Sequence, residues 1–263
     1  MASDSGLSNS QIENALQQIR SMVNGWQVRS NADDGWDPAV ESDLAMDDER
    51  ISPHQTSHLA QGGILSAIDN LQALMLLTVE HRSLHAFAPA TLARAAMECA
   101  SMAIWVLKPE DRGERILRTL KSSTETSSTP TGLYDSGNRA RPRPSATARQ
   151  SGIHRTRERR RRACSRQGGH HSTEAVTAAD TFLRNAGGTG VLPMWQLTSG
   201  YAHGRQWASM AFSKREMGES DDPDTVRLTF TFDYERLLAI AAPACGAIVG
   251  ALNFYNQRSG RPR

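Results

Sequence analysis

Apolar side chains recur every three or four residues along most of the chain, which is the spacing of one face of an α-helix. The longest such run, residues 88–107, is apolar on nearly all sides, has Pro89 in its first turn and ends before Pro109. A helix that is apolar all round is buried, so we expect this one at the centre of the fold. Its main packing stripe is predicted at Leu92, Ala95, Cys99, Met102 and Val106.

The same spacing predicts helices on both sides of this central one. Ser10 and Glu13 have the S-x-x-E spacing of a capping box at the start of a first helix, and a second helix is expected from about His54 to about Val79. The acidic, turn-rich residues 31–49 between them are expected to form a surface connection. A short helix after Pro109 carries Arg112, Arg115 and Arg118 on an expected solvated face.

Strict alternation of apolar and polar residues replaces the helical spacing near the C-terminus. It occurs in 208–212 and again in 226–232, with the turn-rich sequence GESDDPD between them, which is typical of a β-hairpin. We therefore expect a mainly α protein: a helical bundle with a small β-hairpin near the C-terminus and a disordered basic segment.

A last helix is expected after Asp233, with Pro243, Gly246 and Gly250 as interruptions. Its apolar run, from Leu237 to Leu252, is shorter than the roughly 20 residues that cross a bilayer. The sequence therefore predicts no membrane span.

The basic segment, residues 122–173, has no apolar period. It holds eleven Arg against three acidic residues, a net charge of +8, so the remainder of a chain whose total charge is +2 carries −6. Such a composition cannot bury a core and is typical of disorder. We therefore divide the chain into an N-terminal helical half of one domain (1–121), this segment, and C-terminal helices and a hairpin that complete the same domain (174–263).

Two explanations of the basic segment remain open. A basic arm could bind RNA, DNA or an acidic surface through phosphate contacts that do not read sequence. Alternatively, the abrupt change of composition at both edges indicates a double frameshift in a GC-rich gene. The residues that would contact nucleic acid under the first explanation are Arg155, Arg157, Arg159, Arg160, Arg161 and Arg162.

Polar side chains also recur at helical spacing inside the apolar helices. Arg94 and Glu98 lie one turn apart in the central helix, and a buried charge is tolerated only when it is paired and hydrogen-bonded. They form either an ion pair at the edge of the core or one wall of a polar pocket. The residues predicted to converge on that pocket are Asp69, Arg94, Glu98, Trp105, Trp195, Ser199 and His203.

Ser199 and His203 are the candidate catalytic residues, because a serine and a histidine four residues apart on a helix can hydrogen-bond. A nucleophilic site also needs a group that orients the imidazole and an oxyanion hole, and the sequence shows neither. We therefore favour a buried structural His203, bonded to Glu98 or Asp69, over a catalytic one.

The sequence predicts neither a metal site nor a cofactor. The pairs His54/His58 and His81/His85 have a metal-binding step of four but lack the Glu of H-E-x-x-H. The three cysteines are far apart, without a C-x-x-C pair, which fits a reducing compartment. The N-terminus lacks the basic start and apolar run of a signal peptide, so a cytoplasmic location is expected.

The residues LARAAMECASMAIWVLKP, followed by ERILR and later by VLPMWQLTSGYAHGRQW, resemble a group of uncharacterised helical proteins common in actinobacteria, over about half of the chain. That group is distantly similar to the HEPN class of helical bundles, some of which are ribonucleases or toxin components. HEPN nucleases carry an Arg and a His four to six residues apart at a helix end. No Arg precedes His203 at that spacing, and Arg166 with His171 fits it only within the basic segment.

We therefore expect a non-catalytic protein with a structural or interaction role, or the product of a degenerate gene. The alternative that the resemblance implies is a HEPN-like, RNA-associated module of a toxin–antitoxin or defence system. The partner is unknown; RNA, an acidic surface and a second copy of the chain are all compatible with the sequence.

Overall fold

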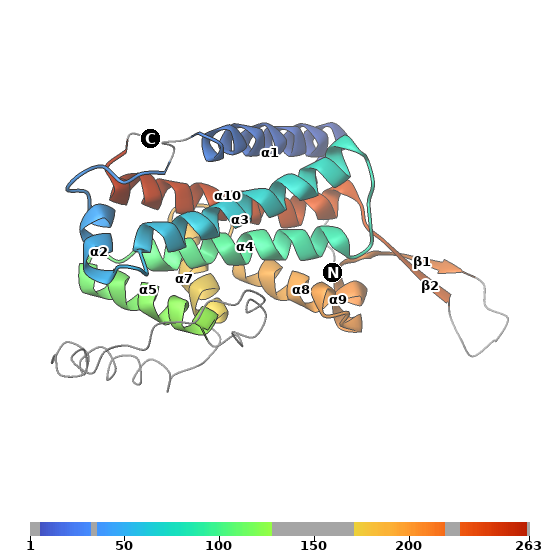
Figure 1. Cartoon of the computed structure of the whole chain (residues 1–263). Coiled ribbons are helices and arrows are strands. Elements are labelled where there is room, and N and C mark those ends of the chain that lie inside the picture. The colour runs from blue at the N-terminus through green and yellow to red at the C-terminus, as the bar shows by residue number, and fades with distance from the viewer. Residues whose placement is uncertain (1–5, 33–35, 128–170, 219–226, 262–263) are drawn as a thin grey trace, which may run out of the picture.

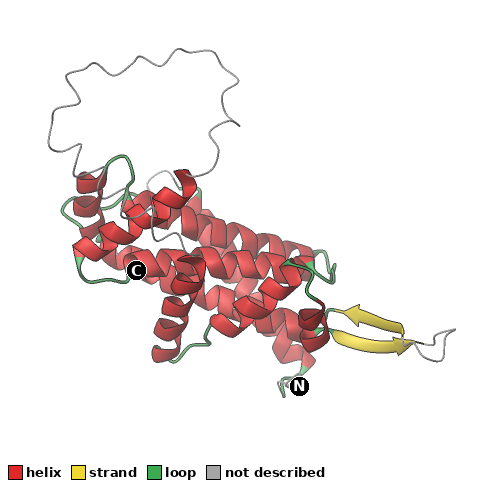
Figure 2. Ribbon diagram, turned by 90° about the horizontal axis from the view of Figure 1, so that it is seen from below, coloured by secondary structure: helices red, strands yellow, loops and turns green. Residues whose placement is uncertain are grey.

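The fold is a helical bundle from which one β-hairpin projects (Figures 1 and 2). The computed structural model describes residues 6–32, 36–127, 171–218 and 227–261. These contain nine α-helices, a π-helical turn and a two-stranded antiparallel sheet near the C-terminus. The predicted class, a mainly α bundle with a small hairpin, is confirmed.

The helix expected at the centre of the fold, α4 (Ala88–Leu107), lies between the other long helices. Helices α3 (Thr56–Met75) and α10 (Tyr234–Ser259) pack along it. In Figure 1, α1 (Asn9–Ser30) covers α3 and α10 from above, and α7 (His171–Asn185) lies below α4. The remaining elements are α2 (Asp43–Ile51), η1 (Leu76–Glu80), α5 (Arg112–Ser127), α8 (Leu192–Ala202), α9 (Gln206–Phe212), β1 (Lys214–Gly218) and β2 (Arg227–Thr231).

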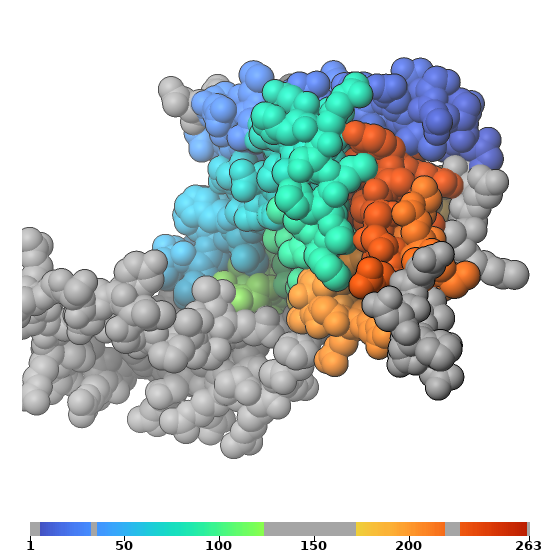
Figure 3. Space-filling view, turned by 90° about the vertical axis from the view of Figure 1, so that its right-hand side faces the viewer, coloured from blue at the N-terminus to red at the C-terminus, as the bar shows by residue number. Residues whose placement is uncertain are grey.

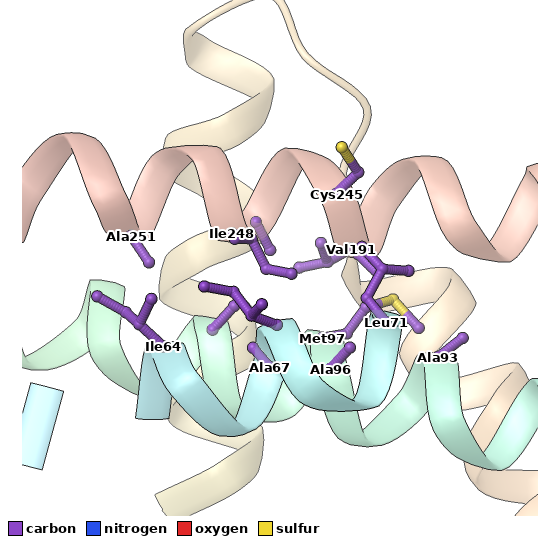
Figure 4. Close-up of a cluster of buried hydrophobic side chains, with 14 of the residues drawn as sticks. Ile64, Ala67, Leu71, Ala93, Ala96, Met97, Val191, Cys245, Ile248 and Ala251 are labelled. Atoms are coloured by element: carbon purple, nitrogen blue, oxygen red, sulfur yellow. The ribbon is translucent and has the colours of Figure 1, made fainter. Parts of the chain in front are cut away.

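The core is built where α3, α4 and α10 approach one another (Figure 4). Alanines line the buried face of α4, and short side chains let neighbouring helix backbones come close. A Cβ at Gly63 of α3, for example, would lie 3.0 Å from the carbonyl oxygen of Cys99. The packing stripe predicted for this helix is therefore on the wrong face, because four of its five residues are only half-buried. The fully buried face consists of Ala93, Ala96, Met97, Ala100, Ala103, Ile104 and Leu107.

The predicted hairpin is present, but the prediction placed its first strand too early in the chain. Residues 208–212 belong to helix α9, and β1 begins at Lys214. In so short a segment, an alternating pattern of apolar residues also fits a helix. Ala208 is buried, and Phe212, one helical turn later, packs against the same cluster. In the observed register Met217 pairs with Leu228, and Arg215 pairs with Phe230.

The prediction that the chain has no membrane span is wrong. Three helices, Thr56–Glu80, Ala88–Leu107 and Tyr234–Ser259, are long and apolar enough to cross a membrane by length and composition. The prediction rested on an interrupted apolar run, whereas α10 continues for 26 residues through Pro243 and two glycines. At 1.5 Å per residue it is about 39 Å long.

The basic segment falls largely on residues 128–170, which lie outside the described residues. Its predicted edges were too wide, because α5 continues to Ser127 and α7 begins at His171. The six arginines proposed to contact nucleic acid, Arg155, Arg157, Arg159, Arg160, Arg161 and Arg162, also lie outside the part of the chain that is described.

Candidate functional site

Four of the predicted pocket residues meet between α4 and α8. Arg94 Nε donates a hydrogen bond to Ser199 Oγ at 2.7 Å, and Arg94 Nη2 lies 2.8 Å from Glu98 Oε2. Trp195 Nε1 donates to the same carboxylate oxygen at 3.2 Å, and the Arg94 guanidinium lies 5.8 Å from the centre of the Trp195 ring. Each side chain thus contacts a polar partner on the facing helix, and the cluster joins α4 to α8.

The side chains of Arg94 and Glu98 are 26% and 24% exposed, so the pair lies at the edge of the core and not in its centre. Burial, and to a smaller extent the charge of Glu98, raises the pKa of the neighbouring Cys99 thiol. This thiol therefore stays protonated near neutral pH and is a poor nucleophile. The Ser199 hydroxyl is engaged by a guanidinium instead of by a general base.

The structure places three predicted pocket residues elsewhere. Asp69 is exposed on α3. Trp105 is buried almost two turns beyond Glu98 on α4, beneath the guanidinium of Arg118, which lies 5.0 Å from its ring centre. His203 is exposed at the C-cap of α8. The prediction of a buried structural His203 is therefore wrong, because α8 ends at Ala202 and the chain turns outward at Gly204, whose φ is +60°.

A buried network of ion pairs, missed in the sequence, lies at the opposite end of the bundle from the hairpin. Arg115 of α5 and Asp47 of α2 are 1% and 0% exposed, and Arg115 Nε donates to Asp47 Oδ2 at 2.7 Å. Arg112 Nε lies 3.2 Å from Asp47 Oδ1. Residues 43–49 of the predicted surface connection thus belong to a packed helix, and Arg115 is a core residue instead of part of a solvated face.

Arg258, in the last turn of α10, extends this network. Its Nη1 donates to Asp43 Oδ2 at 2.7 Å, and its Nη2 lies 3.1 Å from Glu110 Oε1. Arg115 and Arg258 also donate to backbone carbonyls of the turn between α4 and α5, among them that of Pro109. The network therefore ties four segments together. The sequence signal that could have found it is the four-residue step between Asp43 and Asp47, which places both carboxylates on one face of a helix.

Within the described ranges, no group of three or more His, Cys, Asp and Glu side chains could hold a metal ion. All four histidines of the two spaced pairs are exposed.

The end of the bundle that carries the hairpin holds a cluster of aromatic rings. Tyr201 and Phe232 are buried there, with ring centres 6.5 Å apart, and Phe212 packs edge-on against both. Tyr201 also hydrogen-bonds through its hydroxyl to Ser213 Oγ at 2.7 Å, immediately before β1. This cluster fixes the base of the hairpin to the bundle.

Apolar side chains around this base are exposed. Phe87 is 50% exposed although its ring centre lies 6.0 Å from that of Tyr201, and Trp207 and Met210 of α9 are 55% and 41% exposed. On the hairpin itself, the cross-strand partners Met217 and Leu228 are 81% and 38% exposed. We call these five residues the hairpin-end surface.

Comparisons with known proteins returned no match: no protein-family model, no curated protein and no solved structure matched the chain. The HEPN-like resemblance stays a prediction.

Proposed function

We propose that this protein is a non-catalytic interaction protein and that the hairpin-end surface is where it contacts a partner protein. The main support for this proposal is the exposed cross-strand pair of Met217 and Leu228, on a hairpin whose base is held by the aromatic cluster. A two-stranded hairpin is marginally stable alone in water and has two unpaired edges. Exposed apolar patches on such elements mark interaction sites.

The chemistry of the surface indicates an extended, apolar and acidic protein segment as the partner. The backbone groups along the outer edge of either strand can pair with an added strand, as in β-augmentation. Met217 and Leu228 share one face of the hairpin, which suits apolar side chains of the partner. Lys214, Arg215 and Arg227 outnumber Glu216 on the two strands, which favours an acidic partner.

The polar cluster between α4 and α8 supports a non-catalytic role. Arg94 is engaged by both Glu98 and Ser199, and His203 is exposed beyond the helix end. A hydrolytic mechanism needs a general base within hydrogen-bond reach of its nucleophile. The contacts of the cluster instead resemble those of a polar joint between two helices.

Site-specific crosslinking in the native host tests this proposal. A photo-crosslinking amino acid at Met217 should yield a discrete protein adduct, and the additional change Leu228→Asp should abolish it. The control is the same amino acid at Val28, which is 75% exposed on α1. Equal adducts from both positions, or none from position 217, would contradict the proposal.

A further inference from the structure

A cavity of about 520 Å³ opens at the hairpin end of the bundle, apart from the polar cluster and the hairpin-end surface. It lies between the start of α1, the turn that follows η1 and the start of α10. Figure 3 looks onto this end, where α1 (blue) borders the segment after α3 (blue-green) and the start of α10 (orange-red). Its volume is within the range of small-molecule sites.

The floor of the cavity is apolar. Ile12 and Leu16 of α1 are 5% and 2% exposed, and Val79 of η1 and Leu7 complete the apolar lining. Tyr234 adds an aromatic ring that is 37% exposed, and its hydroxyl donates to the carbonyl of Thr78 at 3.4 Å. A ligand with an aryl or alkyl body would bury apolar area here.

The charged side chains of the lining are Glu13, Asp233, Glu235 and Arg82, so carboxylates prevail. Asp233 caps α10 by accepting a hydrogen bond from the Arg236 amide at 2.9 Å, and it also pairs with the Arg236 guanidinium. Glu13 has a weaker pairing, because Arg82 Nη2 stays 3.7 Å from its Oε1 and the two side chains are 65% and 75% exposed.

We propose that this cavity binds a small amphipathic organic cation, an ammonium group on an aryl or alkyl body. The body lies on the floor formed by Ile12, Leu16 and Val79. The ammonium group forms an ion pair with the Glu13 carboxylate, and the ring of Tyr234 provides a cation–π contact. An anion of the same shape is disfavoured by the surplus of carboxylates.

Arg82 competes with such a ligand, because both are cations and both pair with Glu13. Removing Arg82 should therefore tighten binding, whereas removing the Glu13 charge should weaken it. Tighter binding without Arg82 and weaker binding without the Glu13 charge together distinguish a specific site from a general loss of structure, because a damaged fold would not bind the ligand more tightly.

Two probes of equal shape and opposite charge test the site by isothermal titration calorimetry with the full chain. The protein should bind 2-phenylethylammonium and should bind 3-phenylpropanoate more weakly. Glu13→Gln should weaken amine binding about two- to fivefold, as for an exposed ion pair. Tyr234→Leu should weaken it by a similar factor, as for an exposed cation–π contact. Arg82→Gln should tighten it.

The matched control is Glu49→Gln on the exposed face of α2, which should leave binding unchanged. Far-ultraviolet circular dichroism of each variant reports whether the fold is intact. Equal or tighter binding of the anion, weaker amine binding by Arg82→Gln, or binding of neither probe would overturn the proposal. Each of these outcomes is independent of the crosslinking result at Met217.

Discussion

Arg115 donates two hydrogen bonds to the carboxylate of Asp47, from Nε to Oδ2 at 2.7 Å and from Nη2 to Oδ1 at 3.0 Å. The two residues are 68 positions apart in the chain and are almost completely excluded from water. Arg115 Nη1 donates to the carbonyls of Pro109 and Glu110, so four of the five guanidinium N–H groups are hydrogen-bonded, and Nη2 also lies 3.8 Å from Asp43 Oδ1. This pair fixes α2 against α5.

Removing one partner of this pair should strongly destabilise the protein. Asp47→Asn removes the carboxylate that Arg115 binds directly and leaves only Asp43 Oδ1, 3.8 Å from Arg115 Nη2, as a counter-charge. We expect a loss of about 3–5 kcal/mol in the free energy of unfolding. Urea denaturation followed by circular dichroism measures it. The double variant Asp47→Leu with Arg115→Met should lose less than Asp47→Asn alone, because neither member of the buried pair is left without the other.

The control for this prediction is Glu216→Gln, which removes one member of the exposed pair with Lys214. Its effect should stay below about 0.5 kcal/mol. If Asp47→Asn were as harmless as this control, Arg115 would not depend on Asp47 for its burial.

The polar cluster should contribute less than the buried pair, because Arg94 and Glu98 are about one-quarter exposed. Arg94→Met leaves Glu98 and Ser199 without their shared donor, and we expect a loss of about 1–3 kcal/mol. Trp195→Phe keeps the ring and removes only the Nε1 donor, so it should lose about 1 kcal/mol. Denaturant midpoints that rank Trp195→Phe below Arg94→Met in stability would contradict this assignment.

The sequence predicted that the helix of residues 88–107 lies at the centre and that Arg94 and Glu98 meet the later helix, because helical spacing carries both signals. It did not predict which face of α4 is buried, since nearly every side of that helix is apolar. Nor did it predict the burial of Arg115. An arginine on an amphipathic helix has the same local pattern whether its partner is water or a carboxylate 68 residues away.

His203 shows a second limit of the sequence pattern. Spacing by four from Trp195 and Ser199 places it on their face only if the helix continues, but α8 ends at Ala202. Because His203 is exposed, His203→Ala should change the free energy of unfolding by less than about 0.5 kcal/mol. Thermal denaturation checks this, with Ser199→Ala as the comparison, which removes the acceptor for Arg94 and should cost about 1 kcal/mol. A larger loss from His203→Ala than from Ser199→Ala would refute the placement.

The buried Cys245 should make the protein sensitive to alkali. Burial raises the pKa of its thiol from 9.0 to about 11. Because the folded-state pKa lies above that of the unfolded chain, the contribution to stability is complete below pH 9 and is lost as the pH rises to about 11. The loss should be about 2 kcal/mol, and Cys245→Ala should remove it.

Urea denaturation of the parent and of Cys245→Ala, below pH 9 and near pH 11, measures that difference. The parent should lose more stability over this interval than the variant. Equal losses would show that the thiol ionises as readily in the folded protein as in the unfolded chain.

The position of α10 in the bundle has a consequence for synthesis of the chain. Its residues fill the core against α3 and α4, which precede it by well over one hundred residues. A nascent chain therefore displays the apolar faces of those two helices until residues 234–259 have left the ribosome. During that interval, chaperones and proteases meet a chain in which the faces of α3 and α4 that pack against α10 are still uncovered.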